Sequence, residues 1–291
     1  MDLSYSLIGN AIVAGLLLGG FYAAVSVGVS ISFGMLDVVN IAHPAFIILG
    51  SYIALTLNSL LGFDPIVCAV LISPAFFLLG MIVYRAYYLC FEKRGRDALR
   101  GLAFFFGLLF ITEVGLVLVF GVDYRTVNTS YSETAWHAGV LDFPLRLVVP
   151  FCVSVTMIFA LHQLLKRTFF GRAVLAVAQD PLALRLMGVN PTRIRELAFA
   201  LSIATAGIAG SFLIIIQPIQ PAIGREYIGL VFAVCVLGGM GSVYGTLAGA
   251  VILGLAETFT ATFFGPSWSP AVSFGLLLCT LAVRPAGLFG R

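Results

Sequence analysis

The sequence predicts an all-α protein, a polytopic transmembrane helical bundle of about eight or nine spans formed by one domain, residues 1–291. Of these residues, 60% are hydrophobic and only 10% are charged, whereas soluble domains carry about 25% charged residues. The mean hydropathy is +1.08. Apolar runs close to the roughly 20 residues that cross a bilayer recur along the chain and are joined by short loops. Lipid must therefore be the main solvent of this protein.

Each apolar run is predicted to form one spanning helix. The expected spans are residues 7–33, 44–61, 65–89, 102–121, 146–165, 196–217, 228–240, 243–264 and 270–284. The seventh and ninth are short, so an eight-span arrangement with one re-entrant segment stays open. Many of the 31 glycines fall inside the spans, where small residues let membrane helices approach closely.

The basic residues predict the orientation of the bundle. Of the 16 basic residues, all but Arg125, Arg146 and Arg225 fall on one side: in the loops 91–101 and 166–195, near the C-terminus, and at Arg85 just before the first of these loops. Cytoplasmic loops of membrane proteins are enriched in Lys and Arg. The N-terminus is therefore expected outside the cytoplasm, and the C-terminus inside it.

The loop 166–195 contains a short helix with its own start and stop signals. In "DPLALRLMG", Asp180 suits the N-cap, Pro181 the first helical position and Gly188 the left-handed C-terminal stop. Such a segment is predicted to form a two-turn helix at the cytoplasmic surface.

That helix is amphipathic. Leu182 and Leu186 are four residues apart, as are Ala183 and Met187, so the four share a face from which Arg185 points away. A two-turn helix cannot bury such a face alone. From the residues alone, packing on its own bundle and docking in a groove of a partner protein stay equally open.

Two glutamates fall inside predicted spans. An ionisable group in a membrane usually faces a cavity or a partner group. For Glu113, near the middle of its span, two interpretations remain: it lines a path through the protein, or it is a neutral side chain bonded to a neighbouring helix. Glu257 lies closer to the outer end of its span, and two interpretations remain for it as well: it lines the path, or it is simply hydrated there.

A polar stripe runs along the first span. Tyr22, Ser26 and Ser30 are spaced four residues apart and so share one face, which either lines a path or joins helices. Asn40 and His43 flank the break that follows, near the expected cytoplasmic end. For His43 a structural role is favoured, whereas Asn40 is an open candidate for the path.

Several function classes are disfavoured. The three histidines lie in three separate segments, and the five cysteines are scattered, so neither metal-ligand nor nucleophile–base spacing is present. The sequence lacks the G-x-x-x-x-G-K-[ST] loop that binds nucleotide phosphates. The basic residues lack the interleaved aromatics typical of nucleic-acid binding. We therefore expect no metal, no nucleic acid and no enzymatic activity.

Four segments in order resemble the Liv-type (LivH-like) permeases of ATP-binding-cassette (ABC) importers for branched-chain amino acids. They are "FYAAVSVGVSISFGMLDVVNIAHPAF", "GRAVLAVAQDPLALRLMGVNPTRIRELAF", "VCVLGGMGSVYGTLAGA" and "VRPAGLFG". One departure is Pro44 after His43, where the family tends to have Gly; Pro44 suits the start of a helix.

The resemblance implies a role for the loop 166–195 in coupling. In such importers a short cytoplasmic helix inserts into a cleft of the ATPase subunit, and the matching segment here runs from Asp180 to Gly188. Leu182, Leu186 and Met187 are expected to fill that cleft, and Arg172 and Arg185 to meet acidic residues on its rim.

The resemblance also implies the partners. We expect a second Liv-type permease chain, two ABC ATPases that use the ATP, and a periplasmic solute-binding protein that docks on the outer loop 122–145. The chain itself needs no cofactor, and it belongs in the bacterial inner membrane. A related permease for urea, short amides or aromatic acids remains an alternative. A stand-alone secondary transporter or channel is a further alternative, which would not need the docking helix.

Overall fold

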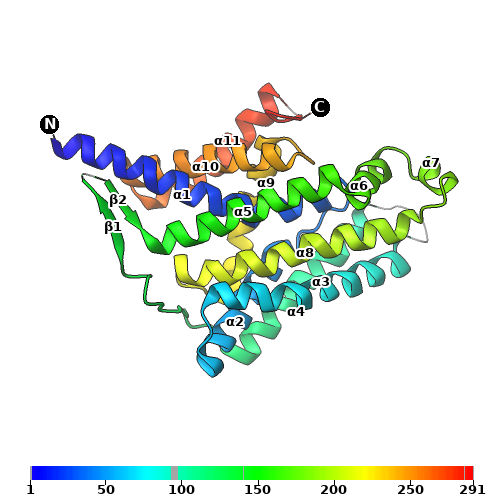
Figure 1. The fold of residues 1–291 in the computed structure, drawn as a ribbon, viewed down its shortest axis with the longest axis horizontal. Helices are drawn as coiled ribbons and strands as arrows, with labels where there is room; N and C mark the ends of the chain where they lie inside the picture. The colour runs from blue at the N-terminus through cyan, green and yellow to red at the C-terminus, as the bar shows by residue number, and fades with distance from the viewer. Residues whose placement is uncertain (1, 93–97, 140, 285, 291) are drawn as a thin grey trace.

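The structure is a computed structural model that describes residues 2–92, 98–139, 141–284 and 286–290. Within these residues nine helices are long and apolar enough to cross a membrane. The predicted all-α bundle is therefore confirmed (Figure 1). The α-helices of these spans are α1 Asp2–Ser32, α2 His43–Leu61, α3 Pro65–Cys90, α4 Ala98–Phe120, α5 Leu145–Arg167, α8 Pro191–Ile216, α9 Glu226–Gly238, α10 Val243–Phe263 and α11 Ser269–Val283.

The seventh and ninth spans are short α-helices lengthened by 3₁₀ turns. The turn η2, Pro221–Arg225, leads directly into α9, and the turn η3, Pro266–Trp268, leads directly into α11. With these turns each segment reaches 18 residues, close to the length that a bilayer requires. Nine spans, rather than eight with one re-entrant segment, therefore fit the described chain.

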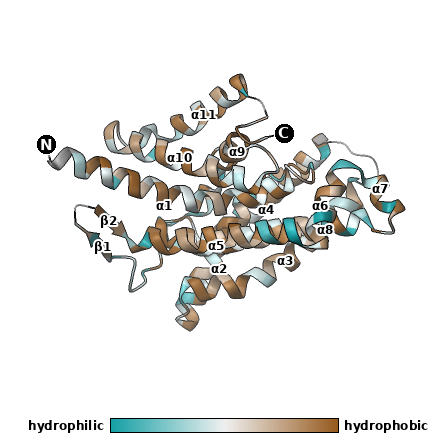
Figure 2. Ribbon diagram, turned by 45° about the horizontal axis from the view of Figure 1, so that its top comes forward, coloured by the Kyte–Doolittle hydropathy of each residue, from teal (hydrophilic) through white to brown (hydrophobic). Residues whose placement is uncertain are grey.

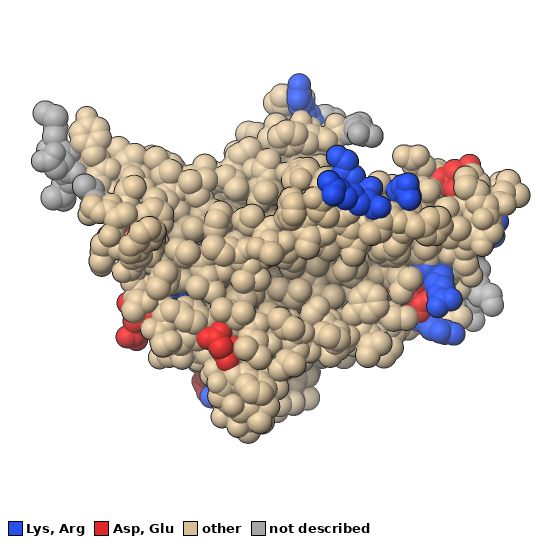
Figure 3. Space-filling view, in the orientation of Figure 1, with Lys and Arg blue, Asp and Glu red and all other residues tan. Residues whose placement is uncertain are grey.

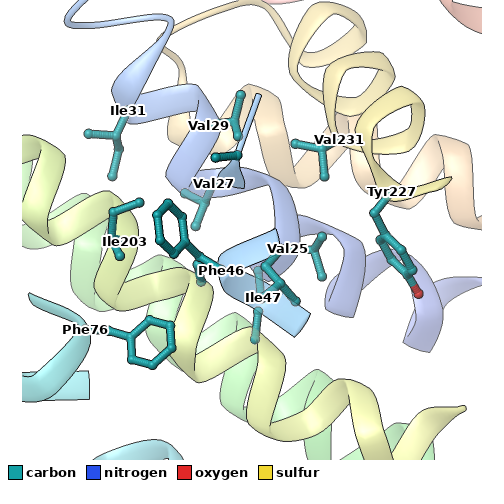
Figure 4. Packing of buried hydrophobic residues seen from close by; sticks show 14 of the residues in the cluster. Val25, Val27, Val29, Ile31, Phe46, Ile47, Phe76, Ile203, Tyr227 and Val231 are labelled. Carbon is teal, nitrogen blue, oxygen red and sulfur yellow. The ribbon is translucent and has the colours of Figure 1, made fainter. Parts of the chain in front are cut away.

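Helices α1 and α8 form the centre of the bundle. Within an apolar 18-residue stretch of each helix, 72% of the residues of α1 and 83% of those of α8 are buried. Helix α1 packs against α10, α8 and α5, while α8 packs against α3 and α2. Figure 4 shows valines of α1 meeting Phe46 of α2, Ile203 of α8 and Val231 of α9.

Glycines permit the close approach of α1 and α10. A Cβ atom at Gly19 would lie 2.7 Å from the Cα atom of Val251, and one at Gly254 would lie 2.6 Å from the Cα atom of Gly19. Both distances are too short for a side chain. The packing role predicted for glycines inside the spans is confirmed at this contact.

The chain direction alternates, so the bundle has two distinct ends. We call the end where α3 and α5 finish and α8 begins the basic end. Two short helices lie there, α6 Phe169–Gln179 and α7 Pro181–Leu186. Figure 2 shows hydrophilic residues gathered around them, and Figure 3 shows Lys and Arg concentrated toward the same part of the molecule. Of the predicted basic side, Lys93, Arg94, Arg96 and Arg291 lie outside the described residues.

A β-hairpin covers part of the opposite end. Strands β1 Ala135–Ala138 and β2 Leu141–Pro144 pair antiparallel, with Trp136 opposite Phe143. The hairpin lies within the expected outer loop 122–145, and its strands of four residues each are too short to be predicted from the sequence pattern.

Candidate functional site

Helix α7 has the start and stop that the sequence predicts. Asp180 Oδ1 accepts hydrogen bonds from the backbone N–H groups of Leu182 at 2.9 Å and Ala183 at 3.0 Å. Gly188 has φ +78°, a left-handed conformation that favours glycine. These caps satisfy backbone groups at both ends of a helix too short to be stable alone.

A Schellman motif fixes the C-terminal end of α7. The N–H of Gly188 donates to the carbonyl of Arg185 at 2.9 Å, and the N–H of Val189 donates to that of Leu184 at 3.1 Å. Leu184 is 5% exposed and belongs to the main core, against which Val189 also packs. Leu184 therefore anchors α7 on the bundle. Leu184 was not among the residues predicted for this site, although such a motif often includes this apolar contact.

The opposite face of α7 is uncovered. The exposed fractions are 66% for Leu182, 84% for Leu186 and 74% for Met187. Helix α7 lies at one extremity of the bundle in Figure 1, where it contacts α6 and the beginning of α8. The structure thus excludes packing of this apolar face on the bundle of the same chain.

The two expected rim arginines are also exposed. Arg172 lies on α6 and Arg185 on α7, and neither forms an ion pair within the described part of the chain. Helix α6 packs against α5 and α8, and the Thr168 side chain caps it by accepting from the N–H of Gly171 at 3.1 Å. The Arg172 side chain therefore projects from a helix that is packed against the bundle and capped.

A buried carboxylate links three helices near the opposite end. Tyr22 Oη on α1 donates to Glu257 Oε2 on α10 at 2.8 Å, and the Ser273 hydroxyl on α11 donates to the other oxygen. Glu257 is 6% exposed and Tyr22 8%. Hydration, one of the two interpretations left open for Glu257, does not fit this structure, because α11 packs beside α10 and encloses the carboxylate.

Glu113 has a charged partner. The guanidinium of Arg225 in η2 donates to both oxygens of Glu113 on α4, with Nε at 2.9 Å from Oε2. The same guanidinium lies 5.6 Å from the centre of the Phe110 ring. Glu113 is nearly buried, whereas Arg225 is half-exposed. Of the interpretations left open for Glu113, a bond to a partner group is therefore the one that the structure contains. The sequence did not indicate Arg225 as that partner, because η2 comes from a distant part of the chain.

The remaining candidates lie at a central helix junction. Ser26, Ser30 and Asn40 are at most 1% exposed, and within the described residues their side-chain polar atoms have no hydrogen-bond partner. The His43 ring packs against α1, where a Cβ atom at Gly28 would lie 2.3 Å from it.

The His43 side chain lies farther from the basic end of the bundle than expected. The Ser202 hydroxyl on α8 donates to the carbonyl of Gly28 at 2.7 Å. At 1.5 Å per residue, Ser202 is about 16 Å along α8 from its first residue. His43, which touches the same glycine position, therefore lies beside the middle of α8. The position expected for His43, near the cytoplasmic end, is corrected accordingly.

The outer loop is attached to the bundle. Tyr131 Oη donates to Asp64 Oδ1 at 3.1 Å, and burial together with the charge of Asp64 raises the pKa of Tyr131 to about 12. The amide of Asp142 in β2 donates to the Asn10 side chain of α1 at 2.9 Å. Trp136 is 67% exposed on the hairpin. The loop thus presents an aromatic surface from a fixed position.

Comparison with known proteins decides the family. The family model described as "Branched-chain amino acid transport system / permease component" matches residues 11–281. The chain belongs to this family of ABC permeases. The permease BraD of a Pseudomonas aeruginosa branched-chain amino acid transport system is 30% identical to it, over 96% of this chain and 95% of BraD.

Further relatives include two different permeases. Escherichia coli K12 LivH is 28% identical, with 95% of this permease and 94% of LivH covered. Salmonella typhimurium LivM is 28% identical over 92% of this permease and 67% of LivM. The solved structure of PsaBC from Streptococcus pneumoniae in complex with Fab matches with a TM-score of 0.52 at 12% identity, covering 96% and 92% of the two chains. That likeness concerns the fold. This permease is therefore a multi-pass membrane protein of the Liv type.

Proposed function

We propose that this permease is the membrane subunit of an ATP-driven importer for branched-chain or related amino acids. One observation carries the proposal: α7 is fixed to the bundle by Leu184 and by its caps, yet Leu182, Leu186 and Met187 are exposed. A fixed helix with a free apolar face suits insertion into a groove of a partner. The family assignment makes an ABC ATPase the expected partner.

The same reasoning gives the orientation and the energy source. The basic end faces the cytoplasm, as the positive-inside rule requires, so the ATPases dock there and the N-terminus lies in the periplasm. Two ATPase subunits bind and hydrolyse ATP, and this chain holds no cofactor. A periplasmic solute-binding protein docks at the opposite end, on the hairpin and its exposed Trp136.

The substrate path forms with a second Liv-type permease, which we propose to be a related but different chain. Similarity to both LivH and LivM supports such a pair. Tyr22 and Glu257 are the path candidates with the strongest geometric support, because a carboxylate oriented by hydroxyl donors suits the ammonium group of an amino acid. Opening of the contacts among α1, α10 and α11 would expose that carboxylate to the path. Ser26, Ser30, Asn40 and Glu113 remain candidates.

Purification tests the assembly. The tagged permease is extracted in mild detergent, and the co-purifying chains are identified by mass spectrometry. An ATPase with a phosphate-binding loop and a second hydrophobic chain are expected. Recovery of a stable permease alone would support a channel or secondary transporter instead. Uptake of labelled leucine in the presence of excess urea, acetamide or phenylalanine then separates the amino-acid substrate from its alternatives.

A further inference from the structure

A cavity of about 410 Å³ lies at the basic end between the last turns of α3 and the beginning of α8. Arg85 on α3 and Arg193 on α8 line it, together with Glu196. Both arginines are exposed, and neither has an ion-pair partner in the described ranges of the chain. Figure 3 shows a basic patch with an acidic neighbour over this part of the molecule.

A second cavity of about 400 Å³ adjoins the first and extends it toward α7. Tyr88 and Thr192 line both cavities, and Arg185 of α7 lines the second. Together the cavities carry Arg85, Arg185, Arg193 and Arg195 against Glu92 and Glu196. The pair of cavities is therefore net positive.

The Arg195 guanidinium in the second cavity has only part of its hydrogen-bonding capacity satisfied. Arg195 is 8% exposed and donates from Nη1 to Glu92. Its Nε atom is buried and has no hydrogen-bond partner among the residues that the structure describes. The positive charge does not depend on the α8 terminus, whose first N–H groups the Asn190 side chain already caps.

The wall of the first cavity is apolar on its membrane side. Met81 of α3, one turn deeper in the membrane than Arg85, lines it, and Leu78 of the same helix is 59% exposed. The neighbouring Ile82 of the same spanning helix is 67% exposed. A ligand in this position meets arginines at one end and an exposed apolar helix face at the other. This combination suits an amphiphile with a phosphate group better than it suits a free phosphate ion.

We propose that the α3–α8 cavity binds the headgroup of an anionic phospholipid from the leaflet at the basic end, with an acyl chain lying along α3. Basic pockets between spanning helices at this level are suited to anionic headgroups. Arg85 and Arg193 contact the phosphate, and the adjoining cavity brings the headgroup close to α7. The proposal concerns binding by this chain alone and does not depend on the transported substrate.

Native mass spectrometry of the detergent-purified permease, titrated with phosphatidylglycerol or phosphatidylcholine, tests the site. The double variant Arg85→Gln/Arg193→Gln should bind phosphatidylglycerol roughly thirty-fold more weakly, since each arginine contributes about a five-fold effect. Its binding of phosphatidylcholine should not change. Arg167→Gln is the matched control, because Arg167 is exposed at the same end but does not line either cavity.

Each contrary result overturns the proposal. Unchanged phosphatidylglycerol binding by the double variant would show that Arg85 and Arg193 do not bind the headgroup. An equal loss of binding in Arg167→Gln would show that the lipid responds to surface charge in general. Displacement of the lipid by excess inorganic phosphate would identify a free-anion site instead. Both arginines are exposed, so an unchanged thermal unfolding temperature confirms that the double variant is folded.

Discussion

Replacement of Leu186 by alanine is the most direct test of the docking role of α7. The side chain is 84% exposed, so its truncation costs the fold of the permease almost nothing. In a complex it would be buried in the groove of the ATPase. Full burial of a leucine side chain contributes about 2 kcal/mol. The variant should therefore bind the ATPase roughly 30-fold more weakly.

The measurement is the equilibrium dissociation constant between immobilised permease in detergent and its purified ATPase. Stimulation of ATP hydrolysis by the permease gives a second readout, which should fall at limiting ATPase concentration. Leu60→Ala is the matched control: Leu60 is 76% exposed but lies at the C-terminal end of α2, at the opposite end of the bundle. Its dissociation constant should match that of the unmodified permease.

One result would refute the reasoning. If Leu186→Ala binds the ATPase within about two-fold of the unmodified permease, a difference of roughly 0.4 kcal/mol, Leu186 is not buried in the interface. The exposed face of α7 would then serve another purpose, and the coupling contact would have to be sought elsewhere at the basic end. A similar loss in Leu60→Ala would show that the assay reports general damage.

Three further predictions follow from buried contacts. Leu184→Ala should weaken the attachment of α7 by about 2–5 kcal/mol, measured as faster amide exchange in α7 with little change in the spanning helices; unchanged exchange would exclude Leu184 as the anchor. Glu257→Gln should leave the fold intact but lower amino-acid uptake in proteoliposomes at least about ten-fold, or about 1.4 kcal/mol; normal uptake would make the carboxylate purely structural. Arg225→Gln should lower the thermal unfolding temperature because Glu113 loses its partner, and addition of Glu113→Gln should restore most of the loss. A double variant less stable than the single one would contradict this pairing.

Features that depend on a single segment were predictable from the sequence. The spanning helices follow from apolar length, although the choice of nine over eight came from the structure. Helix α7 follows from Asp180, Pro181 and Gly188, because capping involves residues only a few positions apart. The seventh span was predicted and recognised as short. Only the structure showed that the 3₁₀ turn η2 extends it to the length of a span. These features are local, so neighbouring residues determine them.

Which residues meet across the bundle depended on the tertiary structure. Tyr22 and Glu257 were both candidates, but their contact joins positions 235 residues apart. Arg225 as the partner of Glu113, and Leu184 as the anchor of α7, were missed. In a soluble helix the polar face marks which side is buried. In this bundle, lipid-facing and core-facing sides are both apolar, so the sequence determined that helices span the membrane, and only their packing decided which faces meet.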